Sequence, residues 1–148
     1  MVDWHGFGIA YNIKMIEIII DTNVLVAAMK SRNGNSFKLL SMIDGGHWRM
    51  NISTPLVFEY ESILKREIEA ARAQDCESLI DYICLVGTAH QIFYLWRPML
   101  KDPKDDHILE LAVKSNASII TWNVRDFGLA GQFGIQVFTP AELLQKGF

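Results

Sequence analysis

The chain has 148 residues, of which 50% are hydrophobic and 21% are charged, as in one ordinary globular domain with a sizeable core. No apolar run reaches the ~18 residues of a membrane-spanning helix, so we expect no membrane partner. The formal net charge of −3 argues weakly against a nucleic-acid partner, which usually leaves a basic footprint. A metal site built from carboxylates would itself make the chain acidic, so a nucleic-acid substrate stays open.

Residues 1–14 carry neither the apolar core nor the cleavage signature of a secretory signal. We expect them to be an N-terminal extension, with Met15 as a candidate native start and residues 15–148 as a single domain. The two cysteines, Cys76 and Cys84, form no C-x-x-C motif. This usage favours a cytoplasmic protein in a reducing environment and argues against a zinc ribbon.

Strands and helices alternate along the chain. Residues 16–20 form a nearly continuous apolar, β-branched run, which is typical of a strand buried on both faces of a parallel sheet. This alternation indicates βαβ units, so we expect an α/β fold whose mainly parallel sheet is covered by helices on both faces. Further strands are predicted at 48–52, 91–95, 118–121 and 135–138, and helices at 24–29, 36–43, 54–68, 76–88, 102–114 and 140–145.

Polar residues follow several of the predicted strands. Asp21 comes directly after the first strand, and residues 121–123 come after a later one. Glu59 and Asp105 lie in the first turns of the helices that follow two other strands. Ligands bind beyond the carboxyl ends of strands in open α/β sheets, so four distant segments are predicted to bring oxygen atoms to one rim.

Asp105 is the most informative of these acids. On a helical wheel it falls on the apolar stripe of Ile108, Leu109 and Ala112, so it is predicted to point into the packed face. A carboxylate there is costly unless it is paired, capped or bound to a metal. Asp106 and His107 are predicted to face solvent. The alternative is that Asp102 caps the helix and Asp105 is a first-turn acid favoured by the helix dipole.

The other candidates also have structural alternatives. Asp21 could instead cap the helix that begins at Thr22. Glu59 lies at the margin of its apolar stripe and could be a solvated residue. Asn123 and Asp126 are one turn apart, and either could be a simple turn residue. The joint case is stronger, because acids that share a small rim repel one another unless a cation neutralises them, and Mg²⁺ prefers such oxygen ligands.

These residues lie in segments that resemble the PIN-domain family, in particular its VapC-like branch of bacterial toxins. The resemblance covers nearly all of residues 15–146, with the motifs in the family's order and spacing. The segments are IIIDTNVLVAA at 18–28, STPLVFEY at 53–60, DPKDDHILELA at 102–112, TWNVRDF at 121–127 and the terminal IQVFTPAELL at 135–144.

The resemblance implies a three-layer α/β/α sandwich and a ribonuclease that depends on Mg²⁺ or Mn²⁺. Asp21, Glu59 and Asp105 match the family's first three acidic positions. Asn123 matches the fourth, where many members have Asp, and Asp126 matches the supporting acid one turn later. The amide removes one negative charge, which puts metal affinity in doubt or gives Asp126 a larger share of the site.

The expected partners are RNA, a second copy of the chain in a homodimer, and a small antitoxin protein; the last two are implied by the resemblance alone. Lys104 and Arg125 are the basic residues closest in sequence to the rim and are expected to contact phosphates. Trp122, which flanks the rim, is expected to stack on a base. The remaining aromatics considered are expected in the core: Trp48, Phe58, Tyr60, Phe93 and Trp96.

Other catalytic classes lack their residues. A haloacid-dehalogenase-like phosphatase needs a second Asp where this chain has Asn23, and no phosphate-binding G-x-x-x-x-G-K-[ST] loop is present. The histidines lack H-E-x-x-H spacing and are interpreted as surface or packing residues. The main alternative is a PIN-like module that binds RNA or protein without cutting. Asn123 keeps that alternative open, and the three retained acids argue against it.

Overall fold

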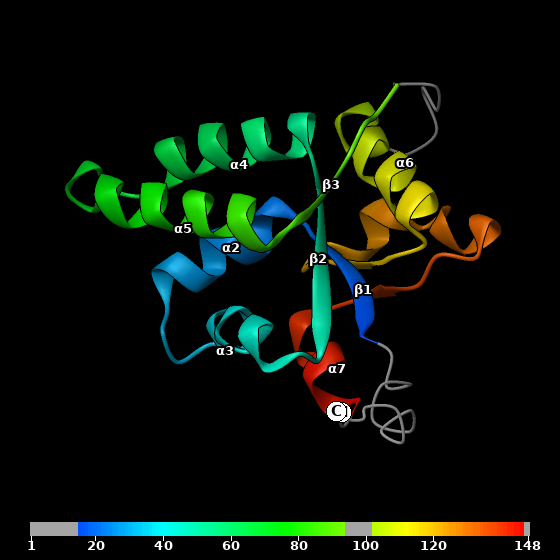
Figure 1. The fold of residues 1–148 in the computed structure, drawn as a ribbon, viewed down its shortest axis with the longest axis horizontal. Helices are drawn as coiled ribbons and strands as arrows, with labels where there is room; N and C mark the ends of the chain where they lie inside the picture. The colour runs from blue at the N-terminus through cyan, green and yellow to red at the C-terminus, as the bar shows by residue number, and fades with distance from the viewer. Residues whose placement is uncertain (1–14, 94–101, 147–148) are drawn as a thin grey trace, which may run out of the picture.

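A computed structural model describes residues 15–93 and 102–146, and its centre is a parallel sheet of five strands in the order β3-β2-β1-β4-β5 (Figure 1). Non-consecutive neighbours such as β1 and β4 are reached by helical crossovers, as expected for βαβ units. The strands are β1 (Ile16–Ile20), β2 (Trp48–Ser53), β3 (Thr88–His90), β4 (Ser118–Ile120) and β5 (Val137–Phe138).

Helices cover both faces of this sheet, which confirms the three-layer α/β/α fold. In Figure 1, α2, α4 and α5 lie on one side of the strands and α6 on the other. The α-helices are α2 (Thr22–Lys30), α3 (Asn35–Ser41), α4 (Thr54–Glu67), α5 (Ala73–Val86), α6 (Asp106–Ser115) and α7 (Pro140–Gln145). Short 3-10 helices are η1 (Ile43–Gly45), η2 (Ala70–Arg72), η3 (Pro103–Asp105), η4 (Val124–Phe127) and η5 (Ala130–Phe133).

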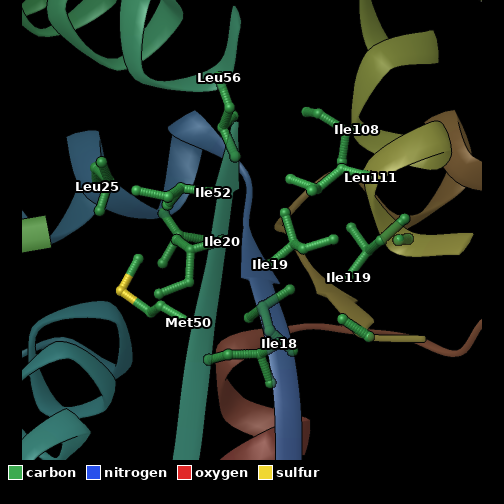
Figure 2. Close-up of a cluster of buried hydrophobic side chains, with 14 of the residues drawn as sticks. Ile18, Ile19, Ile20, Leu25, Met50, Ile52, Leu56, Ile108, Leu111 and Ile119 are labelled. Carbon is green, nitrogen blue, oxygen red and sulfur yellow. The ribbon is translucent and has the colours of Figure 1, made fainter. Parts of the chain in front are cut away.

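The apolar run of β1 explains why the sheet lies in the middle. Ile18, Ile19 and Ile20 are all fully buried, because alternate side chains enter the two opposite cores. Figure 2 shows Ile20 on the side of Leu25, and Ile19 on the side of α6. Charged residues at these positions would be buried on either face, so the run itself predicts a central parallel strand.

Strand register then aligns the carboxyl ends of β1 and β4. Ile20 pairs with Ile120, and the backbone N–H of Asp21 donates to the Ile120 carbonyl at 2.9 Å. The buried Tyr60 hydroxyl of α4 donates to the carbonyl of Ile20. The helices α4 and α6 both begin at this same end of the sheet (Figure 1). Residues from four segments distant in sequence therefore meet at one edge.

Some predictions about local structure were wrong. The strand predicted at 91–95 is instead β3 at Thr88–His90; residues 91–93 form no strand, and residues 94–95 lie outside the described part. The helix before it ends at Val86, because Gly87 turns the chain where a Cβ would come within 2.8 Å of the Ile83 carbonyl. The chain therefore enters the sheet three residues earlier than its apolar pattern suggests.

The aromatic residues divide between core and surface. Trp48 and Tyr60 are buried as predicted, whereas Phe58 and Phe93 are 65% and 56% exposed, which contradicts the prediction. Phe93 lies instead under the Lys114 ammonium group, 5.0 Å from the ring centroid. The predicted core position of Trp96 and the predicted extension at 1–14 fall outside the described residues. Across 15–93 and 102–146, no helix is long and apolar enough to span a bilayer.

Candidate active site at the sheet edge

Asp21 is both a helix cap and a member of the acidic rim. Its Oδ1 accepts a hydrogen bond from the backbone N–H of Thr22 at 2.8 Å, which caps α2. Its Oδ2 accepts bonds from the Thr121 hydroxyl at 2.7 Å and from the Asn23 amide at 3.1 Å. Burial raises the pKa of Asp21; the Thr121 bond opposes this rise and the charge of Glu59 adds to it. The two roles proposed as alternatives therefore coexist.

Glu59 projects from the second turn of α4 towards the same edge. The helix starts at Thr54 as predicted, and the Ser53 hydroxyl caps it by accepting from the Leu56 N–H at 3.3 Å. The Thr22 hydroxyl donates to Glu59 Oε2, and His107 Nε2 lies 3.3 Å from Glu59 Oε1. Burial alone would raise the pKa of this carboxyl, but the bonds from His107 and Thr22 outweigh it and lower the pKa. Glu59 is therefore a rim residue rather than a solvated one.

Asp105 occupies the end of η3, immediately before α6, and it is half-buried rather than packed into the apolar face. Burial and then the charges of Asp21, Asp102, Glu59 and Asp126 raise its pKa to about 7. Asp102 forms the preceding turn, since its carboxylate accepts from the Lys104 N–H at 3.0 Å. Asp102 therefore caps the turn of η3, whereas Asp105 stands at the N-cap position of α6 without a side-chain capping bond and joins the acidic rim.

The helix after Asp105 differs from its predicted orientation. Asp106 and His107, predicted to face solvent, are 1% and 8% exposed. The reason is tertiary: α6 packs against the strands of the sheet, β3 included, and also against α4, and every residue of its first turns is buried. A helical wheel reports one apolar stripe and does not register the additional neighbours.

Asn123 and Asp126 lie on opposite ends of the short helix η4. Asn123 is exposed, and its backbone N–H donates to the Thr121 hydroxyl at 3.0 Å. Asp126 is half-buried, and its charge contributes to the raised pKa values of both Asp21 and Asp105. Because its charge acts on both of these acids, Asp126 belongs with the rim carboxylates; Asn123, an amide, contributes no charge there.

The residues suggested for RNA contact flank the rim. Lys104 is exposed on η3, and Arg125 is exposed on η4. Trp122 is 40% exposed, and its indole N–H donates to the Ser36 hydroxyl at 2.8 Å. That bond ties the ring to the start of α3, so one edge of the indole is fixed while part of its surface meets solvent.

Sequence reasoning missed the polar residues that hold the acids. Thr22, Asn23 and Thr121 directly follow strand ends, so their proximity to the rim was a usable signal. Asn23 also accepts a bond from the Trp122 backbone N–H at 3.0 Å, which joins the ends of β1 and β4. The contact of His107 with Glu59 spans 48 residues and has no local signature.

The four rim carboxylates have the chemistry of a site for a hard cation, but they do not form a tight cluster. Carboxylate oxygens are the ligands that Mg²⁺ and Mn²⁺ take, and the mutual charge effects of Asp21, Glu59, Asp105 and Asp126 show that they share one region. Yet no three His, Cys, Asp or Glu side chains in the described ranges are close enough to hold one ion together. This arrangement fits a cation that keeps several of its waters, as Mg²⁺ usually does.

Comparison with known structures gives the same fold. The chain is 14% identical to a chain of VapBC2 from Rickettsia felis, in a complex described as bound to a promoter DNA fragment (TM-score 0.59, covering 84% of this chain and 98% of that one). It is 15% identical to a chain of FitAB bound to the IR36 DNA fragment (TM-score 0.61, 83% and 94%). It is 17% identical to a chain of VapBC-1 from nontypeable Haemophilus influenzae (TM-score 0.57, 85% and 99%).

Comparison with family models is more specific. No curated protein gives a significant match. The model described as PIN domain matches residues 17–125, which is well over half of the chain and includes Asp21, Glu59, Asp105 and Asn123. The chain therefore belongs to the PIN-domain family.

Proposed function

We propose that this protein is a metal-dependent endoribonuclease that acts in the cytoplasm as the toxin of a toxin–antitoxin pair. The observation that carries the proposal is the acidic rim, where burial and the charges of Asp21, Asp102, Glu59 and Asp126 raise the pKa of Asp105 to about 7. Such repulsion is a cost in a protein that binds no cation and is relieved in one that does. Membership of the PIN-domain family and the toxin–antitoxin complexes among the similar structures support the same proposal.

In this proposal the chain's residues divide the work at the sheet edge. When bound, Mg²⁺ or Mn²⁺ would supply positive charge and an activated water for hydrolysis of a phosphodiester. Asp21, Glu59, Asp105 and Asp126 would hold the cation, directly or through its waters. Asn123 and Asp126 would orient the attacking water from η4. No side chain acts as a covalent nucleophile.

The same proposal assigns substrate contacts to the exposed residues beside the rim. Lys104 and Arg125 would hold phosphates on either side of the scissile bond, so RNA binding should weaken as salt rises. The exposed part of the Trp122 ring would stack on a base. Single-stranded or looped RNA is the proposed substrate, because only unpaired bases leave their faces open to such a ring.

The decisive experiment is cleavage of a mixed RNA pool by the purified protein. With Mg²⁺ or Mn²⁺ we expect cleavage that EDTA abolishes and that the variants Asp21→Ala and Asp105→Ala lack. Glu77→Gln, an exposed acid on α5, is the matched control and should cut like the parent. Cleavage that survives both alanine substitutions would refute the site.

The alternative function is a PIN-like module that binds RNA or protein without cutting. The exposed amide at Asn123 and the separation of the carboxylates favour it. It replaces the nuclease if the parent binds Mn²⁺ and RNA but leaves every RNA intact under conditions where the control variant is folded.

We also propose a homodimer and a small antitoxin partner. Expression of the parent should stop bacterial growth, whereas Asp21→Ala should not, and sedimentation of the purified chain should give twice the monomer mass. Growth unaffected by the parent would reject the toxin role while leaving the nuclease test independent of it.

A further inference from the structure

The buried His107 follows one rim acid in the chain and contacts a second one. It is the second residue of α6, two positions after Asp105, and it is 8% exposed. Its Nε2 is 3.3 Å from Oε1 of Glu59, which belongs to α4. Thus one turn at the start of α6 carries a rim carboxylate and also contacts a second one.

The chemistry of the pair fixes the direction of the bond. An ionised carboxylate only accepts hydrogen bonds, so Nε2 of His107 carries the hydrogen and donates it. The Thr22 hydroxyl occupies the other oxygen of Glu59. Donors from α6 and α2 therefore hold the two oxygens of a side chain from α4. Each oxygen accepts more than one bond, so both retain capacity for a cation or its water.

The second nitrogen of the imidazole ring is in an unfavourable environment. Nδ1 of His107 is buried and, within the described residues, has no hydrogen-bond partner. A buried polar atom left unpaired is unfavourable, and a Leu at this position would avoid that cost. Among residues 15–93 and 102–146, the polar contact that His107 makes is with Glu59, and a Leu could not make that contact.

We propose that His107 is a positioning residue that holds the Glu59 carboxylate at the rim in the orientation that cation binding requires. The inference rests on the proposed nuclease function and deepens its account of that site. His107 touches neither substrate nor cation in this role. It acts through Glu59, whose Oε1 lies 3.3 Å from Nε2 of His107 while the Thr22 hydroxyl bonds to Oε2.

Two substitutions distinguish the effect of the hydrogen-bond donor at Nε2 from the effect of the ring's bulk. In His107→Gln the amide nitrogen takes the place of Nε2 and can still donate to Glu59. In His107→Asn the amide nitrogen takes the place of Nδ1 and falls short. Both are polar and uncharged, so they remove the ring equally. His90→Gln is the control, because His90 bonds to Asn51 rather than to a rim acid.

The measurements are Mn²⁺ affinity by calorimetry, kcat and KM for RNA cleavage, and the metal-free Tm, all on the full chain. We expect His107→Asn to weaken Mn²⁺ binding and lower kcat by about 10–100-fold, the usual effect of losing a partner that orients a metal ligand. KM should change little, since Lys104 and Arg125 hold the phosphates. His107→Gln should recover most of the loss, and His90→Gln should match the parent.

Equal Mn²⁺ affinity and kcat in the Gln and Asn variants would overturn the positioning role. So would equal impairment of both with equally lowered Tm, since that pattern means packing alone. If the parent binds Mn²⁺ but cuts no RNA, the proposed nuclease fails, and the Mn²⁺ affinities of the two variants still decide this inference. If the parent binds no Mn²⁺, both fail.

Discussion

Glu59 and Asp105 lie at the same sheet edge and have opposite electrostatic settings. Donors from Thr22 and His107 outweigh burial and lower the pKa of Glu59. Burial and the charges of Asp21, Asp102, Glu59 and Asp126 raise the pKa of Asp105 to about 7. One carboxylate is thus stabilised in its charged form by the fold itself. The charged form of the Asp105 carboxylate is destabilised unless a positive charge lies close to it.

For the proposed cation site, this difference means that the two carboxylates would contribute in different ways. Glu59 is oriented before any ligand binds, because its bonds come from the protein. If the proposed cation binds, Asp105 would gain its stabilisation from that ligand, and cation binding would then be coupled to folding stability.

The largest expected effect comes from neutralising the repelled acid. In Asp105→Asn we expect RNA cleavage to fall by at least about 100-fold, the order expected when an electrostatic contact to the reacting centre is lost. The metal-free Tm should stay equal or rise, because the substitution removes repulsion. Asp81→Asn, an exposed acid on α5, should change neither quantity. A Tm drop of several degrees in Asp105→Asn would mean that the charge of Asp105 stabilises the metal-free fold and is not repelled.

The next effect is the pH dependence of stability without metal. The folded pKa of Asp105, about 7, exceeds its ordinary 3.8, so between these values the unfolded chain gives up the proton first. Rising pH therefore lowers the free energy of unfolding across that window, and below it this group makes no difference. Glu59 acts oppositely: its stabilisation is complete above its ordinary 4.5 and is lost as the pH falls through the lower folded pKa.

Melting curves in EDTA from pH 4 to 8 measure this dependence. After allowance for solvent screening of a half-exposed group, we expect the parent to lose about 6 °C relative to Asp105→Asn between pH 4 and 7. Mg²⁺ should restore the loss at pH 8 and have little effect at pH 5, where Asp105 holds its proton. Parallel curves for parent and variant would remove the distinction between the two acids.

The same two acids show which features the sequence could predict. The buried run of β1, the position of Asp21 after it and the parallel order of the strands all follow from local pattern, and the structure has them. Glu59 was at the margin of its helical stripe, and only the packing of α4 against the end of β1 through Tyr60 decides its direction. Local pattern therefore sufficed where the chain enters the rim directly from a strand.

Local pattern failed where three elements meet. The start of α6 is buried because the helix packs against the sheet, including β3, and against α4. His107 is therefore buried, and the prediction that it faces solvent was wrong. The Glu59–His107 bond joins residues 48 positions apart, and a single sequence carries no signal for such a pair. The raised pKa of Asp105 likewise depends on the charges of Asp21, Glu59 and Asp126 from three other segments, which only the assembled fold brings together, and on Asp102 three residues before it.

A smaller effect is expected from changing the stabilised acid. Glu59→Gln replaces one carboxylate oxygen by an NH2 group and removes the charge, so the Thr22 hydroxyl can no longer donate to that atom and the bond from His107 is no longer made to an ionised acceptor. We expect a metal-free destabilisation of about 1 kcal/mol, or about 4 °C in Tm. Glu61→Gln, exposed two residues later on α4, is the control and should melt with the parent. Identical Tm values for the two variants would show that the donors do not stabilise Glu59.

The smallest effect isolates one donor. Thr22→Val keeps the shape of the side chain and the backbone N–H that bonds to Asp21, and it removes only the hydroxyl that donates to Glu59. We expect a loss of about 0.5 kcal/mol and a rise in the pKa of Glu59, because one of the bonds that oppose burial is gone while that of His107 remains. Carbon-13 NMR of the Glu59 carboxyl during an acid titration measures that pKa directly. Since Asp105 sits beside Glu59 and its pKa is raised by the Glu59 charge, the titration of Asp105 should hardly move at neutral pH, where Glu59 is ionised in both proteins. A shift of Asp105 as large as that of Glu59 would mean that the two acids titrate as one coupled unit, and their separation into a held and a repelled carboxylate would not stand.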